Sequence, residues 1–114
     1  MKTSKILLKG TGASPGITKG RVRLVRSAEE VETLDNGEIL VASFITQDFL
    51  PSIKRHANIC GVVTDKGGAT CHAAIVMREL KICYVAGVGN ATKKLKDNTK
   101  VEIDGRKGIV YEGS

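Results

Sequence analysis

The sequence has few of the residues that build aromatic cores, rigid turns or disulfide frameworks. Its 114 residues include no Trp, two Phe, two Tyr and two Pro, so aliphatic side chains must fill the core. The three cysteines are an odd number, and no two of them form a CxxC pair. This pattern argues against a disulfide framework and against a zinc site. We therefore expect a reduced, cytoplasmic protein with no tightly bound metal.

Long apolar runs and concentrated charge are also missing. The longest purely apolar run, Ala73–Met77, is far shorter than the ~20 residues of a membrane span. The net charge is +6, but residues 1–57 and residues 58–114 each carry nine basic and six acidic side chains. Nucleic-acid modules concentrate their positive charge and add aromatic side chains that stack on bases. The sequence therefore predicts no membrane partner and no nucleic-acid partner.

Apolar stretches alternate with turn signals along the whole chain, which predicts a single mixed α/β domain over residues 1–114. A loop is expected over Gly10–Gly16 and a lysine-rich segment over Lys93–Lys96. Helices are expected over Thr46–His56, over Cys71–Lys81 and after Ser27, which has capping-box spacing to Glu30. Ile6–Leu8 is an apolar run that leads into the loop at Gly10–Gly16. The expected strands are Arg21–Arg26, Glu38–Ser43, Ile59–Thr64, Cys83–Ala86, Lys100–Asp104 and Ile109–Tyr111.

The segment TDKGGATCHAAIVMREL, residues 64–80, carries the most chemical information. Gly67 and Gly68 permit a backbone in which successive N–H groups turn inward as an anion-binding nest. Thr70 is placed to cap the following helix. His72 then falls in the first turn, where free N–H groups and the helix dipole favour bound negative charge. Because a neutral imidazole is a nucleophile, this arrangement predicts a phosphohistidine at His72.

A second interpretation of His72 stays open at this point. A histidine near a helix start can be a hydrogen-bonded residue at the edge of the core. A diglycine turn before a helix is also a common structural device. The spacing alone does not choose between the two interpretations.

Several segments together resemble the phosphohistidine, or swivelling, domain of the phosphoenolpyruvate-utilising enzymes. That family includes phosphoenolpyruvate synthase, pyruvate phosphate dikinase and enzyme I of the sugar phosphotransferase system. The TCH form at residues 70–72 is nearer to the synthase branch than the TSH form. The segments that carry the resemblance are GGATCHAAIVMREL, the upstream GVVTD, the downstream GVGNAT, the loop GASPG at Gly12–Gly16, Asp48 and the closing IDGRKGIVYEG.

The resemblance implies a three-layer β/β/α swivelling fold with mixed sheets, in which His72 is phosphorylated. It also implies a kinase-type transferase component that relays phosphate between an ATP-grasp nucleotide site and a TIM-barrel site for pyruvate or phosphoenolpyruvate. Mg²⁺ and ATP or phosphoenolpyruvate would bind at those partner sites, and no cofactor would bind tightly here. Because 114 residues are too few to include a barrel, the chain is not expected to turn over alone.

Three positions depart from the family pattern. Ala69 stands where the family often has Arg, which removes one possible phosphate-facing cation. Cys83 replaces a common Pro, and Thr46–Pro51 is only loosely similar to the usual Thr-x-Pro-Asp pattern. These departures concern the substrate branch and the transfer partner more than the nucleophile.

Other residues near the motif each have a functional and a structural interpretation. Thr70 can contact phosphate and matches a position of regulatory phosphorylation in the dikinase branch, or it only caps the helix. Cys71 can be a reactive thiol at a helix start or a small packing residue. Asp65 can orient the imidazole or cap a turn. Ser14 and Gly16 can lie near the phosphorylated histidine or form a tight structural turn.

Two further features receive little functional weight. His56 is expected at the exposed end of its helix, and Lys93, Lys94 and Lys96 are expected to be a solvated surface that could also steer an acidic partner. The alternatives to a phosphoryl carrier are a non-catalytic regulatory module of the same fold, which docks on a larger phosphotransferase, and a basic nucleic-acid binder.

Overall fold

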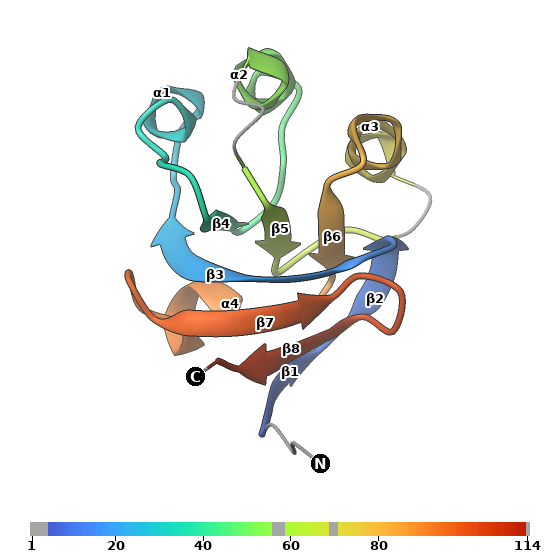
Figure 1. Ribbon diagram of the computed structural model, residues 1–114. Helices are drawn as coiled ribbons and strands as arrows, with labels where there is room; N and C mark the ends of the chain where they lie inside the picture. Colours follow the sequence, from blue (N-terminus) through green and yellow to red (C-terminus); the bar gives the residue numbers. More distant parts are fainter. Residues whose placement is uncertain (1–4, 56–58, 69–70, 114) are drawn as a thin grey trace.

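A computed structural model describes residues 5–55, 59–68 and 71–113 of the chain (Figure 1). Four helices and eight strands occur in these ranges. They are β1 (Ile6–Lys9), β2 (Thr11–Ser14), β3 (Ile17–Leu24), α1 (Ala28–Val31), β4 (Glu38–Ala42), α2 (Phe49–Arg55), β5 (Gly61–Thr64), α3 (His72–Leu80), β6 (Cys83–Ala86), α4 (Ala91–Lys94), β7 (Lys100–Asp104) and β8 (Ile109–Glu112).

The eight described strands form one mixed sheet in the order β1-β8-β7-β3-β4-β5-β6-β2. Strands β3, β4, β5 and β6 are parallel to one another. Strands β7, β8, β1 and β2 pair antiparallel with their neighbours. The long strand β3 belongs to both halves, and β7, β8 and β1 turn under the parallel strands while α1, α2 and α3 lie above them (Figure 1). This arrangement confirms the predicted three-layer β/β/α fold.

Two apolar cores separate the three layers. All residues of β4 and β5 are buried, as expected for parallel strands that are covered on both faces. Within β4, Leu40 packs into the core under the helices, while its neighbours Ile39 and Val41 pack into the core above the antiparallel strands. Helix α3 contributes Val76 and Met77 to the first core. The alternation along β4 therefore holds the helical layer and the antiparallel layer to opposite faces of one sheet.

The predicted loop at Gly10–Gly16 contains a strand instead. Strand β2 pairs with β6, with Thr11 opposite Ala86 and Gly12 opposite Val85. A Cβ atom on Gly12 would collide with the carbonyl oxygen of Arg106, so glycine is required there by a close backbone approach. Glycine lowers strand propensity, which is why the sequence pattern did not indicate this strand.

The remaining element predictions differ from the structure mainly at their ends. Helix α2 begins at Phe49 rather than Thr46, and the short helix α4 overlaps the first two residues of the lysine-rich segment. Strand β3 begins at Ile17, four residues before the predicted start. At α1, the Ser27 side chain makes no capping hydrogen bond, and the Glu30 carboxylate accepts a hydrogen bond from the Arg26 amide at 2.6 Å. The Glu30 carboxylate thus bonds the residue before the N-cap, and neither hydrogen bond of a capping box is made at the described start of α1.

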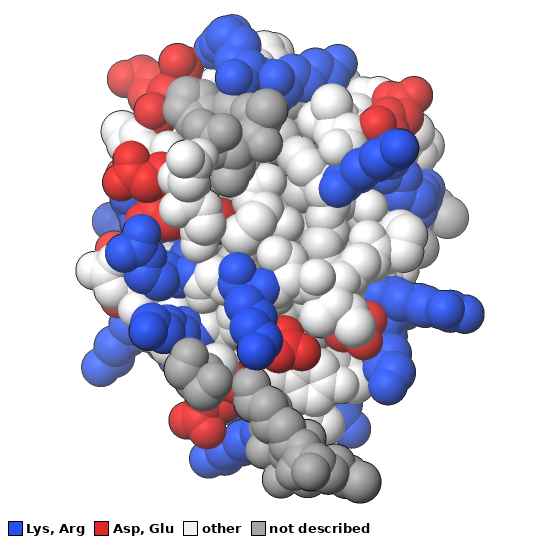
Figure 2. Space-filling model, in the orientation of Figure 1, with Lys and Arg blue, Asp and Glu red and all other residues white. Residues whose placement is uncertain are grey.

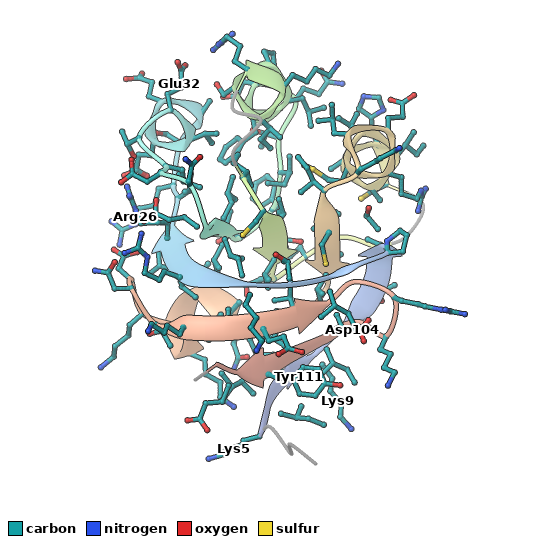
Figure 3. The ribbon with its side chains drawn as sticks, in the orientation of Figure 1. Lys5, Lys9, Arg26, Glu32, Asp104 and Tyr111 are labelled. Atoms are coloured by element: carbon teal, nitrogen blue, oxygen red, sulfur yellow. The ribbon has the colours of Figure 1, made fainter. Side chains whose placement is uncertain are left out.

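Charged side chains are dispersed over the face of the molecule in Figure 2, where Lys and Arg alternate with Asp and Glu. Figure 3 places Glu32 at the helical layer and Lys9, Asp104 and Tyr111 at the antiparallel layer. Cys60, Cys71 and Cys83 are free thiols, as predicted. Among the described helices, none has the length and apolarity to cross a membrane.

Candidate functional site

His72 is the first residue of helix α3 and is exposed to solvent. Cys71 occupies the N-cap position with extended backbone angles, φ −70° and ψ 157°. Its amide donates to the Gly68 carbonyl at 3.3 Å, and its carbonyl accepts from the Ile75 amide at 3.3 Å. Because Val76 and the other core-facing residues of α3 anchor the helix on the sheet, the His72 ring stays at the solvent-facing helix start. The prediction that His72 lies in the first turn is confirmed.

The loop before α3 continues from strand β5. The amides of Asp65 and Lys66 donate to the carbonyls of Ala42 at 3.2 Å and Ser43 at 2.9 Å, which extends the parallel hydrogen bonding past the strand end. Gly67 then has a φ of +119°, which disfavours any residue with a side chain. A Cβ at Gly67 would lie 3.3 Å from the Tyr84 hydroxyl, whereas one at Gly68 would meet nothing within 4 Å. Gly67 therefore allows the close packing, and Gly68 borders open space.

Tyr84 supports this loop from the buried side. It is 1% exposed, and its hydroxyl lies 2.9 Å from the Thr64 hydroxyl. The Thr64 hydroxyl donates to the Lys66 carbonyl at 2.7 Å, so Tyr84 is the donor to Thr64. Burial raises the pKa of Tyr84 to about 12, and the phenol stays protonated near neutral pH. The backbone at Lys66 is thus fixed from the buried side of the loop.

A hollow of about 130 Å³ lies beside His72. Lys66 is the only charged side chain among its described lining residues, and its ammonium lies 6.0 Å from the centre of the Phe44 ring. An anion in this hollow would meet an imidazole, an ammonium group and a helix N-terminus. The described lining residues are Phe44, Ile45, Thr46, Gln47, Leu50, Lys66, Gly67, Cys71, His72, Ala73 and Tyr84.

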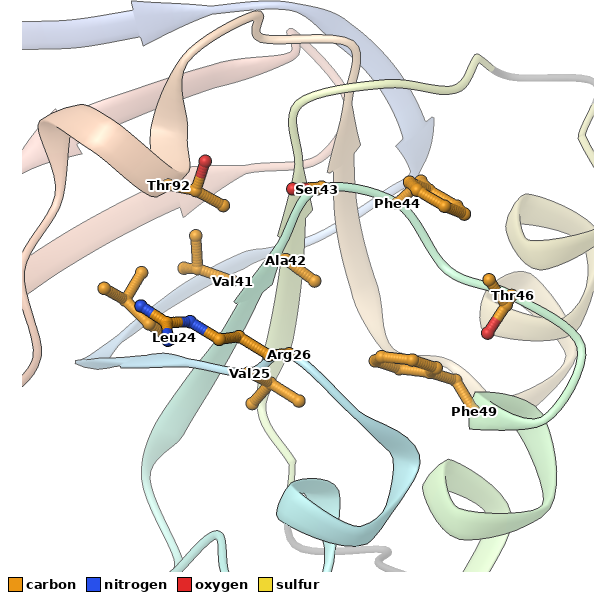
Figure 4. A pocket seen from close by; sticks show the side chains of 10 residues that line it. All are labelled: Leu24, Val25, Arg26, Val41, Ala42, Ser43, Phe44, Thr46, Phe49 and Thr92. Atoms are coloured by element: carbon orange, nitrogen blue, oxygen red, sulfur yellow. The ribbon is translucent and has the colours of Figure 1, made fainter.

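A larger hollow of about 450 Å³ lies next to it, at the carboxyl ends of β3 and β4 (Figure 4). The two hollows share Phe44 and Thr46 as lining residues. Arg26 is the charged side chain among the described residues of the larger hollow, which include no imidazole, thiol or carboxylate. These residues are Leu24, Val25, Arg26, Val41, Ala42, Ser43, Phe44, Thr46, Phe49 and Thr92.

Asp65 does not take the imidazole-orienting role that was one of its two interpretations. One carboxylate oxygen accepts from the Ala91 amide and from the Thr92 amide at 3.3 Å. The other accepts from the Thr92 hydroxyl at 2.6 Å. Both oxygens are therefore committed to the start of helix α4, because that helix leaves its first amides without partners of its own. The capping interpretation describes these contacts.

Ser14 ends strand β2 and Gly16 lies in the turn between β2 and β3. Neither is a described lining residue of the two hollows. Ser14 is 2% exposed, and among the described residues its hydroxyl has no hydrogen-bond partner. Gly16 has a φ of +130°, and its carbonyl accepts from the Gly105 amide at 2.8 Å and the Cys83 thiol at 3.1 Å. Burial raises the pKa of Cys83 to about 11. These contacts favour the structural-turn interpretation.

Two predictions concern residues outside the described ranges. Thr70, with both its phosphate-contact and its capping interpretations, is one of them, and His56 is the other. The N-cap position of α3 itself is held by Cys71, which makes no side-chain capping bond and packs half-buried against the core under the helices. The described residues contain no group of three or more potential metal-ligating side chains.

Sequence reasoning did not single out Lys66 or Phe44. Lys66 precedes the two glycines directly, and this position would have been the signal, because any loop that brings Gly67 toward a helix start also carries its neighbour there. The family pattern pointed only to the position of Ala69 for a phosphate-facing cation within the chain. Phe44 gave no signal, because its place between the two hollows depends on how β4 ends.

Sequence comparisons with known proteins indicate one family. The sequence pattern described as "PEP-utilising enzyme, mobile domain" matches residues 34–108. The chain is 52% identical over 114 residues, its whole length, to "Probable phosphoenolpyruvate synthase" of Methanothermobacter thermautotrophicus, and covers 16% of that protein. It is 54% identical over 109 residues, 96% of the chain, to the protein of the same description from Archaeoglobus fulgidus, and covers 14% of it.

The chain is also similar to a solved structure. The NMR solution structure of an Enzyme I protein, nEIt, matches with a TM-score of 0.61 and 34% identity, over 70% of this chain and 32% of that chain. The chain therefore spans only a small part of the length of these proteins.

Proposed function

Because the chain belongs to the family of PEP-utilising enzyme mobile domains, we propose that it carries a phosphoryl group on the imidazole of His72. The observation that carries this proposal is the exposed position of His72 at the start of α3. Helix-start amides and the positive end of the helix dipole stabilise a phosphoryl group there. The resemblance of the chain to synthase-type proteins supports the same role.

The transfer itself is a substitution at phosphorus. A neutral ring nitrogen of His72 attacks the phosphorus of the donor, so that an N–P bond forms as the P–O bond to the leaving group breaks. The leaving oxygen takes the bonding electron pair. The reverse substitution, with an oxygen of the acceptor as nucleophile, returns the imidazole to its neutral form. This divides one difficult transfer into two easier ones.

The donor and acceptor sites belong to other domains or subunits in this proposal. We propose an ATP-grasp nucleotide site and a TIM-barrel site for pyruvate or phosphoenolpyruvate as the two partners, with Mg²⁺ bound at those sites. The chain covers 14 to 16% of its curated relatives, which leaves ample length in such proteins for both. The 114-residue chain by itself is expected to relay phosphate without turning over.

The experiment mixes the chain with the ATP-grasp and barrel portions of a phosphoenolpyruvate synthase and a donor labelled at its transferable phosphoryl group. We expect acid-labile, base-stable label on the wild-type chain and a loss of more than about 100-fold in His72→Ala, since the nucleophile is gone. Arg26→Met, in the larger hollow, is the control and should keep its label.

Label that persists in His72→Ala would contradict the proposal. A wild-type chain that binds the partner portions but takes no label would contradict it too, and would instead support a regulatory module. In that case, binding should survive His72→Ala.

A further inference from the structure

We propose that Lys66 is the cation that neutralises the phosphoryl group on His72. This inference rests on the proposed function and adds a residue to it. The position of Ala69 supplies no charge of its own, so a cation for the phosphoryl group has to come from elsewhere. Lys66 is the charged side chain that the described part of the chain places in the same hollow as His72.

The size of that hollow fits a phosphoryl group. Its volume of about 130 Å³ is several times the ~10–15 Å³ of such space that one water molecule needs, so the hollow has room for a group larger than water. A transferred phosphoryl group has four heavy atoms, one phosphorus and three oxygens. Lys66 and His72 both line this space, so the phosphoryl oxygens on the ring would occupy the same hollow as the ammonium group.

The backbone of Lys66 is held while its side chain is free to turn. Its amide donates to Ser43 at 2.9 Å, and its carbonyl accepts from the Thr64 hydroxyl at 2.7 Å. The side chain is exposed, and none of the ion pairs among the described residues includes it. A lysine ammonium on a four-carbon stem can then reach toward an anion from a fixed base.

The resting contact of Lys66 is weak enough to be exchanged. Its ammonium lies 6.0 Å from the Phe44 ring centre, at the outer limit of a cation–π interaction. The neighbouring carboxylate of Asp65 does not compete for the ammonium group, because both of its oxygens accept bonds at the start of α4. An ammonium-to-phosphoryl hydrogen bond is the stronger interaction, so phosphorylation of His72 would draw Lys66 away from Phe44.

The test measures the rate and the final extent of labelling in the mixture of the chain with the synthase portions. Lys66→Met is expected to lower the rate of His72 labelling by about 10- to 100-fold, which is the range of one charge-assisted hydrogen bond. Lys66→Arg should keep most of the wild-type rate, because it keeps the charge at the same place.

Lys9→Met is the matched control for lost charge. Lys9 is exposed, and it lies beside Tyr111 at the antiparallel layer, away from the helices (Figure 3). All three variants should have the same melting temperature as the wild type, since each changes an exposed side chain.

The outcomes distinguish this inference from the proposed function on which it rests. If the wild-type chain takes no label, the proposed function is overturned. If the wild type is labelled and Lys66→Met is labelled as fast as Lys9→Met, only the role of Lys66 is overturned. Slow labelling in both Lys66→Met and Lys66→Arg would also overturn it, because the charge would then not be the cause.

Discussion

The two adjoining hollows differ in size and in chemistry: one is larger, and the other has the more reactive side chains. The larger, about 450 Å³, lies at the carboxyl ends of parallel strands, where α/β folds commonly bind ligands. The smaller, about 130 Å³, holds His72 and Lys66. Size and place in the fold would select the first, whereas the proposed nucleophile and the proposed cation both lie at the second. The proposed transfer site is therefore chosen by its side chains and not by its volume.

The hollows also differ in what forms their walls. The larger is lined by the ends of β3 and β4, which are fixed by the sheet, and by the segments that follow them, with one residue each from α2 and α4. The smaller is closed by the loop between β5 and α3, and this loop depends on Gly67 and on the buried hydroxyls of Thr64 and Tyr84. The smaller hollow should therefore be much more sensitive to single substitutions in its supporting residues.

The largest effect on stability is expected from Gly67→Ala. Its φ of +119° lies outside the left-handed region that alanine tolerates, and the new methyl would approach the Tyr84 hydroxyl at 3.3 Å. We expect a loss of about 2 kcal/mol or more in the free energy of unfolding, together with slower labelling of His72. Urea denaturation and the labelling experiment measure the two effects.

Gly37→Ala is the matched control. Gly37 has a φ of +80° and nothing within 4 Å of an added Cβ, so only local backbone strain of about 1 kcal/mol is expected. Labelling should be unchanged. Equal losses of stability in the two variants would show that the Tyr84 contact does not support the loop.

A smaller effect is expected from Asp65→Ala. This variant should affect the larger hollow and leave the smaller one unchanged. Its carboxylate holds Thr92, a lining residue of the larger hollow. Loss of this cap should cost about 1 kcal/mol of unfolding free energy. Because these bonds point away from the smaller hollow, the rate of His72 labelling in the folded variant should stay within about twofold of wild type.

Asp65→Asn keeps an acceptor oxygen and should recover part of the stability. The interpretation would fail if Asp65→Ala kept full stability but lost its label, since Asp65 would then act on His72 and not on α4.

The sequence was sufficient to predict the mixed α/β class and the position of His72 at a helix start for identifiable reasons. Strands β4 and β5 are buried along their whole length and produce continuous apolar runs. Helix α3 shows its buried side as a stripe that includes Val76 and Met77. The diglycine turn and His72 are adjacent in the chain, so that part of the site needed no tertiary information.

The features that the sequence did not predict depend on contacts between distant residues. Strand β2 forms by pairing with β6, and its Gly12 is required because it passes close to Arg106, 94 positions later in the chain. Asp65 caps a helix that begins 26 residues after it, and this distant contact decides between the two interpretations that the sequence left open. The position of Phe44 between the two hollows is likewise set by tertiary packing.

The last expected effect is a loss of stability at alkaline pH. It concerns Tyr84, a lining residue of the smaller hollow. Burial raises the pKa of Tyr84 from an ordinary value of 10.0 to about 12. The folded chain therefore keeps this proton at pH values where the unfolded chain loses it. The stabilising contribution is complete below pH 10 and is lost as the pH rises toward 12. The described lining residues of the larger hollow include no group of this kind.

Urea denaturation at pH 8 and pH 11 tests this expectation by comparing wild type with Tyr84→Phe. The wild type should lose about 1 kcal/mol more unfolding free energy between the two pH values than the variant, which has no phenol to titrate. Cys83, whose pKa is raised to about 11, contributes equally to both proteins and cancels. Tyr111→Phe, at the antiparallel layer, should follow the wild type. Equal losses in wild type and Tyr84→Phe would mean that the phenol under the loop is accessible to water, and the contrast between the two hollows would lose its structural basis.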